Sequence, residues 1–296
     1  MFQFFANIFG YLLNIINNFV GNYGLAIILF TLIIKLIMLP LSIKQQRTMK
    51  KSAKLQEQMK ILQFKYKNDP EKLNKETMDL YKKEKMNPLS GCVSAILQFV
   101  LLISIFYMVR NPLTYMEKID KEQINIYVQQ LKEDEIEVSN VYSEIDVIRE
   151  KAHLQEKFPE DENLNKINLN MQFCGLDLSK IPQQHLGDWT VYIIPVLYII
   201  STFISMRITT SMQNKDKKKE DKVLEITEGE EKEVEKEDNS EMEDAMAQSN
   251  KMMSWMMPFM SVSISLVAPL GLALYWLVNN ILMIVERLIL NKVVKD

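Results

Sequence analysis

Long apolar segments alternate with strongly charged segments along this chain. A helix needs about 20 mostly apolar residues to cross a bilayer. The segments that reach or approach this length are 21–43, 89–110, 188–208, 251–268 and 271–290. The last two are separated by the turn signal Pro269-Leu270-Gly271, so they are expected to form a helical hairpin with almost no loop. The pattern predicts an all-α membrane protein with five transmembrane helices.

The average composition hides this pattern. A mean hydropathy of −0.07 and 25% charged residues are ordinary for a soluble protein. One apolar run could be a buried core helix of such a protein. Several runs of this length, separated by charged blocks, favour a membrane protein instead.

The N-terminal segment, residues 1–20, is apolar and aromatic and contains no Lys or Arg. Asn7, Asn14, Asn17 and Asn18 recur at near-helical spacing, which favours an amphipathic helix lying in the membrane interface. The absence of basic residues leaves a sixth span as the other interpretation. Without a positive n-region or a small-residue cleavage site, the segment is not expected to be a cleavable signal peptide.

Basic residues are distributed unevenly between the charged segments. Lys44–Lys85 holds 13 Lys and Arg against six acids, whereas Asn111–Gly187 holds eight against fifteen. Short cytoplasmic loops carry the excess of Lys and Arg. We therefore expect the N-terminus and an outer loop (111–187) outside, and residues 44–88, 209–250 and the tail 291–296 in the cytoplasm.

The three polar segments differ in expected structure. Residues 44–88 have helical periodicity interrupted by Asn68-Asp69-Pro70, which predicts a cytoplasmic hairpin of two antiparallel amphipathic helices. Residues 209–250 are rich in Glu and Asp and are expected to form a disordered acidic linker. The outer loop is expected to form a small peripheral helical cap, with helices over Tyr115–Glu133 and Val141–Lys157.

Enzyme signatures are absent from the sequence. There is no Gly-rich phosphate loop, no nucleophile elbow and no metal-ligand spacing. Cys92 lies in a span and Cys174 in the outer loop, an arrangement that fits neither a metal site nor a disulfide framework. We therefore expect a protein without catalysis, metal or cofactor.

Lys35 lies inside the first predicted span, nine residues before Lys44. A charge at the centre of a span costs about 2.5–3.5 kcal/mol on insertion scales, so it needs water or a partner. One interpretation is structural: the lysine snorkels to the interface or pairs with Glu286, the acid in the last span. The other is functional: Lys35 lies in a water-filled cavity that is open to the cytoplasm.

Other polar residues within the spans favour a cavity. Single Ser and Thr residues are common between membrane helices, but amides and a lysine together are unusual. The polar residues in question are Thr31, Ser94, Gln98, Ser261, Ser263, Ser265, Asn279 and Asn280.

Three stretches of the chain resemble the YidC/Oxa/Alb membrane protein insertases, and among them the YidC of Gram-positive bacteria. The first is NYGLAIILFTLIIKLIMLPLSIKQQRTMKK; the second runs from QEQMKILQFKYKNDPEKL through NPLSGCVSAILQFVLLISIFYMV; the third is MMSWMMPFMSVSISLVAPLGLALYWLVNN. NPLSGC opening a span after a basic hairpin, with GLALYW opening the last span, is a specific combination. The middle of the outer loop and the acidic linker are unmatched.

The resemblance implies a fold and a site. Five spans would enclose a hydrophilic groove open to the cytoplasm and to lipid. The groove cation of the family, usually arginine, falls on Lys35, which keeps the charge but loses the planar guanidinium fork. The implied groove residues are Lys35, Thr31, Gln98, Ser94, Tyr275, Trp276 and Asn279. The implied slide for a passing substrate helix, on the second and fourth spans, contains Phe99, Leu102, Met257, Met260 and Ser261.

The resemblance also implies partners. These are nascent membrane proteins, the ribosome, the Sec translocon and the lipid bilayer of a bacterial plasma membrane, with no direct recognition of nucleic acid. The alternative function is a small transporter or anion channel that uses the intramembrane lysine. Transporters usually contain repeated halves, and this sequence contains none. A passive scaffold is a third interpretation.

Overall fold

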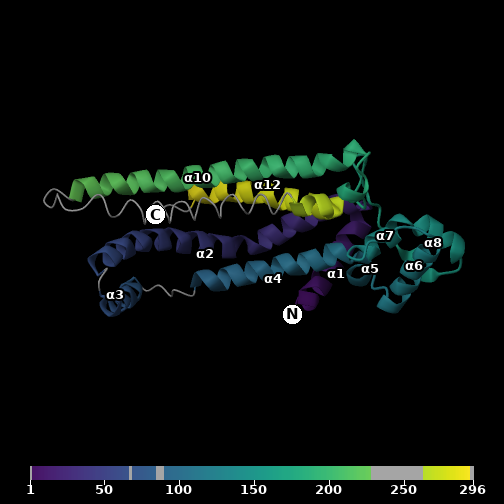
Figure 1. Cartoon of the computed structure of the whole chain (residues 1–296), viewed down its shortest axis with the longest axis horizontal. Coiled ribbons are helices and arrows are strands. Elements are labelled where there is room, and N and C mark those ends of the chain that lie inside the picture. The colour runs from purple at the N-terminus through teal and green to yellow at the C-terminus, as the bar shows by residue number, and fades with distance from the viewer. Residues whose placement is uncertain (1, 67–68, 85–89, 228–262, 294–296) are drawn as a thin grey trace.

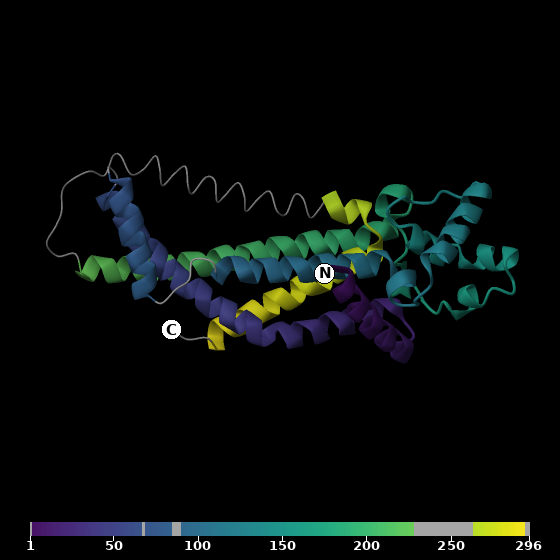
Figure 2. The ribbon, with the colours of Figure 1, turned by 90° about the horizontal axis from the view of Figure 1, so that it is seen from below.

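Long helices run side by side along the molecule and carry a compact group of short elements at one end (Figure 1). The computed structural model describes residues 2–66, 69–84, 90–227 and 263–293. The long helices are α2 (Tyr23–Lys65), α4 (Ser90–Arg110), α10 (Ile193–Thr227) and α12 (Leu270–Val293). α2, α10 and α12 begin at the end that bears the short elements, whereas α4 ends there (Figure 2).

Three of these helices contain segments long and apolar enough to cross a membrane: Tyr23–Thr48, Trp189–Ser211 and Leu270–Asn291. α4 contributes a shorter apolar segment, Ile96–Arg110. The predicted fourth span, 251–268, lies mostly outside the described residues. Its described part is helical over residues 263–267. The chain is therefore mostly helical with three long apolar span candidates and one shorter one, and the count of five spans stays a prediction.

Two helices continue past the ends predicted for their spans. α2 runs through residue 43, the predicted end of the first span, and includes Pro40. No turn signal follows until Asn68-Asp69-Pro70, so the basic segment extends the same helix. α10 likewise continues to Thr227, and the expectation of a disordered linker is wrong over 209–227. A change from apolar to charged composition does not by itself end a helix, because Lys and Glu are good helix formers.

The hairpin (residues 44–84) consists of the second half of α2 and α3 (Pro70–Lys83). α3 begins at the predicted turn, where the Asp69 carboxylate accepts a hydrogen bond from the backbone N–H of Lys72 at 3.0 Å and Pro70 occupies the first helical turn. The Tyr81 hydroxyl lies 3.4 Å from the Met59 sulfur, which joins α3 to α2.

The N-terminal helix α1 (Phe2–Val20) packs across the bundle, with Asn14 and Asn17 turned towards the cap and Asn7 and Asn18 exposed. Asn14 Nδ2 donates to the carbonyl oxygen of Met116 at 3.0 Å, and Asn17 Nδ2 donates to that of Asn168 at 2.9 Å. Gly10 lies so close to the backbone of Tyr115 that a Cβ there would be 2.2 Å from its carbonyl oxygen. Asn14 and Asn17 therefore lie on the docking face of α1. The expected placement of this helix in a membrane interface stays a prediction.

The cap (residues 111–192) is made of short elements. They are α5 (Pro112–Tyr115), α6 (Lys121–Glu133), α7 (Ser143–Arg149), α8 (Lys151–Lys157), α9 (Glu162–Lys166), β1 (Gln172–Phe173), β2 (Leu176–Asp177), and the 3-10 turns η1 (Pro182–Gln184) and η2 (Trp189–Tyr192). The two expected cap helices are each divided. β1 and β2 pair antiparallel and are joined by Cys174 and Gly175, both with positive φ, as a two-residue turn of type I′ requires.

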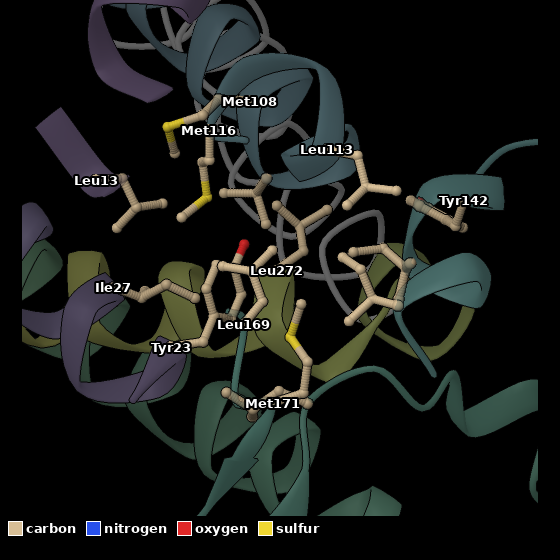
Figure 3. Close-up of a cluster of buried hydrophobic side chains, with 14 of the residues drawn as sticks. Leu13, Tyr23, Ile27, Met108, Leu113, Met116, Tyr142, Leu169, Met171 and Leu272 are labelled. Atoms are coloured by element: carbon tan, nitrogen blue, oxygen red, sulfur yellow. The ribbon is translucent and has the colours of Figure 1, made fainter. Parts of the chain in front are cut away.

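The cap is joined to the bundle by one continuous core (Figure 3). The core brings together Leu13, Tyr23, Ile27, Met108, Leu113, Met116, Tyr142, Leu169, Met171 and Leu272. Cap carbonyls also accept hydrogen bonds from the first N–H groups of α12: Lys180 from Leu270 and Leu178 from Gly271, both at 2.9 Å. Since these N–H groups have no partner within their own helix, the cap satisfies the helix start and closes this end of the bundle.

Candidate functional site

Lys35 of α2 and Glu286 of α12 form an ion pair. Lys35 Nζ lies 3.3 Å from Glu286 Oε2, with the side chains 21% and 14% exposed. α2 and α12 start together at the cap, where the Tyr23 ring lies against Gly271, and they run in the same direction. Among the interpretations of Lys35 given by the sequence, the structure contains the ion pair with Glu286.

The Glu286 carboxylate is only partly satisfied by this pair. Its second oxygen, Oε1, is buried and has no hydrogen-bond partner among the described residues. A buried acceptor left without a donor is costly, more so when it carries charge. The site can therefore take a further donor at Oε1.

Thr31, one turn before Lys35, is buried and uses its hydroxyl within its own helix. The hydroxyl donates to the carbonyl oxygen of Ile27 at 2.6 Å. A Thr that binds the carbonyl four residues earlier keeps its proton away from a neighbouring cavity. Thr31 thus lies one turn before Lys35 on α2, but its hydroxyl proton is already bonded to Ile27.

The last span makes a second set of polar contacts, with α10. Asn280 is buried and donates to Ser201 Oγ at 2.9 Å and to Thr202 Oγ1 at 3.2 Å. Two turns further on, Arg287 Nη1 donates to Thr209 Oγ1. Three predicted site residues lie on the same helix: Tyr275 is buried, Asn279 is half-buried, and the ring centroid of Trp276 is 6.2 Å from that of Tyr198.

The contact between Arg287 and Thr209 is not among those predicted from the sequence. The spacing of the polar residues could indicate it, because Asn280 and Arg287 are seven residues apart and so lie on one face of α12. Ser201 and Thr209 have almost the same spacing on α10. Two helices whose polar residues share this period can pair them at successive turns.

The remaining predicted residues are distributed along α4 and the undescribed segment. Gln98 is exposed on α4, as are Phe99 (60%) and Leu102 (43%). The Ser94 side chain and all of Met257, Met260 and Ser261 lie outside the described residues. The structure thus brings Lys35 to Glu286, and the grouping of the other groove and slide residues stays a prediction.

A separate open cleft lies at the cap end. Its lining includes Tyr142, Ile181, Gln183, Gln184 and Val267. Glu286 lies 16 residues beyond the start of α12, which is roughly 24 Å along a helix. The cleft is therefore distinct from the Lys35–Glu286 pair.

Comparison with known families matches residues 15–296 to the family described as 60Kd inner membrane protein. The chain belongs to this family. It is the YidC/Oxa group of membrane insertases that the sequence motifs indicated, and the chain is accordingly a multi-pass membrane protein.

Similar proteins include three named "Membrane protein insertase YidC". They come from Francisella tularensis subsp. novicida (strain U112), subsp. tularensis (strain SCHU S4 / Schu 4) and subsp. holarctica (strain LVS). Each is 48% identical over 108 residues, which is 36% of this chain and 20% of the relative. The chain thus matches about a fifth of the length of these family members.

Proposed function

We propose that this chain is a membrane protein insertase and chaperone, which inserts nascent membrane proteins and helps them fold. The observation that supports it is Lys35, a partly exposed cation inside an apolar span of a member of the 60Kd inner membrane protein family. Three relatives are named as insertases, although the matched part is only 20% of their length. The proposed function requires neither enzymatic catalysis nor a cofactor.

The architecture that fits this function has five spans around a hydrophilic groove. The groove opens towards the hairpin in the cytoplasm, and the cap lies outside. The orientation is supported by the basic character of the hairpin and the acidic character of the cap. The core between cap and bundle supports closure of the outer end.

The mechanism follows from the cost of moving a polar tail through lipid. A wet groove that reaches part of the way shortens the dry path, and Lys35 attracts acidic residues in the tail. The exposed apolar side chains of α4, including Phe99 and Leu102, offer the substrate helix an exit into lipid. Membrane potential and hydrophobic transfer of the substrate supply the free energy.

The partners follow from the same proposal. The chain receives substrates from ribosomes, either alone or beside the Sec translocon. The likeness of its sequence to the YidC of Gram-positive bacteria supports a place in that subgroup. The relatives named above, however, come from Francisella.

Reconstitution in vesicles tests the function. The purified chain should insert a single-span substrate with a short acidic outer tail, Lys35→Arg should retain insertion, and Lys35→Glu should abolish it. Equal insertion by wild type and Lys35→Glu would rule out the groove mechanism. Ion flux without any protein substrate would instead support a transporter or channel.

A further inference from the structure

Glu286 is the carboxylate that contacts Lys35 in the part of the chain that the structure describes. Its Oε2 is 3.3 Å from the ammonium, and both side chains are mostly buried. An ammonium group and a carboxylate at this distance neutralise one another, so an approaching tail meets a dipole instead of a full positive charge.

The pair is also incompletely bonded. Lys35 carries three N–H donors, and within the described residues one of them bonds Glu286. Glu286 Oε1 is buried without a partner in the same part of the chain. A fully satisfied buried pair would resist exchange, whereas this one has both an unused donor and an unused acceptor.

Lys35 and Glu286 differ in how freely their side chains can leave the ion pair. Lys35 is on a flexible four-carbon stem and Glu286 follows Val285 on the same turn as Arg287, whose guanidinium is held by Thr209 of α10. Lys35 can therefore turn to another anion while the contact between Arg287 and Thr209 keeps this part of α12 against α10.

We propose that Glu286 determines the charge specificity of the site, as the internal anion that a substrate carboxylate must displace from Lys35. This rests on the proposed insertase function. Glu286 sets how acidic a translocated tail has to be before Lys35 favours it. With Glu286 present, a tail with one acid competes against a carboxylate that is already in place, and a tail with two acids competes better.

The consequence for Glu286→Gln is specific. The amide keeps the shape and leaves Lys35 without its counter-charge, so a tail with one acid should gain most and a neutral tail should gain nothing. A role in packing alone would change the insertion of every substrate by the same factor.

The test uses the full-length chain in vesicles of phosphatidylcholine and phosphatidylethanolamine, in which no anionic lipid competes for Lys35. Three single-span substrates differ only in their outer tail, with no, one or two Asp residues. The readout is the rate at which each tail becomes protected from added protease. For Glu286→Gln the ratio of one-acid to neutral rates should rise on the order of tenfold over wild type.

Three further variants keep the result interpretable. Glu286→Asp shortens the carboxylate arm and should raise the ratio less than Glu286→Gln, which also provides a test if the amide variant does not fold. The double variant Lys35→Gln with Glu286→Gln should insert acidic and neutral tails at similar rates. Glu162→Gln removes a carboxylate from an exposed ion pair with Lys166 in the cap, and should leave the ratio unchanged.

Each outcome decides between the proposals. Insertion by wild type with the same ratio in Glu286→Gln and Glu286→Asp overturns the role of Glu286 alone. A double variant that still prefers acidic tails also overturns it. A wild-type chain that inserts none of the three substrates overturns the proposed function, and this inference with it.

Discussion

Asn280 of α12 donates a hydrogen bond to Ser201 of α10 across 2.9 Å, within two helices that are each apolar enough to cross a membrane. The same amide nitrogen lies 3.2 Å from Thr202 Oγ1. In an apolar surrounding no water competes for such groups, so the contact fixes which faces of α10 and α12 meet.

Removing this contact should loosen the helix pair. Asn280→Ala should lower the free energy of unfolding by about 0.6–2 kcal/mol, the range for hydrogen bonds between membrane helices. Ser201→Ala should cost less, because Thr202 can still accept from Asn280. Unfolding in mixed micelles with increasing denaturing detergent measures each value. The double variant should be less destabilised than the sum of the single variants, and strict additivity would show that the two residues do not interact.

Local signals in the sequence were sufficient for some elements. The turn at Asn68-Asp69-Pro70 was predictable because its chemistry is local: Asp69 caps the helix that Pro70 starts. The apolar segments that became α2, α10 and α12 were equally clear from length and composition. The possible pairing of Lys35 with Glu286 could be stated as an alternative, because an acid in the spans is rare.

Contacts between distant segments could not be inferred in the same way. Asn14 and Asn17 predict the polar face of an interfacial helix because their partners, Met116 and Asn168, are more than a hundred residues away in the sequence. The periodicity of a helix gives the direction of a polar stripe but not what covers it. The extension of α10 to Thr227 is not evident from the sequence for another reason: a charge-rich composition is typical of disorder, although Lys and Glu are also good helix formers.

The docking of α1 depends on Gly10. A Cβ at this position would lie 2.2 Å from the Tyr115 carbonyl oxygen, which is backbone and cannot rotate away. Gly10→Ala should therefore push α1 off the start of the cap and destabilise the chain by about 1–3 kcal/mol. Gly187→Ala is the matched control, because nothing lies within 4 Å of its added Cβ. Thermal unfolding in detergent compares the two, and equal melting temperatures would contradict the close approach.

The cap should lose stability in acid through Asp134. Hydrogen bonds from His153 at 2.7 Å and Lys157 at 3.0 Å lower the pKa of this carboxylate from 3.8 to about 2. A depressed pKa stabilises the fold above the unfolded value, and this contribution disappears as the pH falls from about 4 to about 2. Asp134→Asn should lower the melting temperature at pH 5 and flatten its dependence on pH across this window.

Other carboxylates titrate in the same range, so the comparison needs a control. Asp188, whose pKa is also lowered to about 2 by Lys180 and Thr190, leaves part of the acid sensitivity in place. Glu162→Gln should leave the pH dependence of the melting temperature as in wild type, because Glu162 forms only an exposed ion pair with Lys166. A slope that is unchanged in Asp134→Asn would mean that the Asp134 cluster does not stabilise the cap.

The exposed apolar face of α4 should contact a substrate during insertion. Phe99 is 60% and Leu102 43% exposed, on a helix whose opposite side packs against α1 and α12. Large apolar side chains on such a surface need either lipid or another helix as a neighbour.

Site-specific crosslinking distinguishes a lipid neighbour of α4 from a substrate helix. The native cysteines are first replaced by Cys92→Ser and Cys174→Ser, and Phe99→Cys or Leu102→Cys is then combined with a stalled nascent chain that carries a single cysteine in its apolar segment. Both positions should form disulfides with the nascent chain, whereas Ile126→Cys, on α6 of the cap and 47% exposed in the native chain, should not. Crosslinking that is as strong at residue 126 as at residue 99 would show that the chain contacts the protein without preference, and the exit along α4 would have to be abandoned.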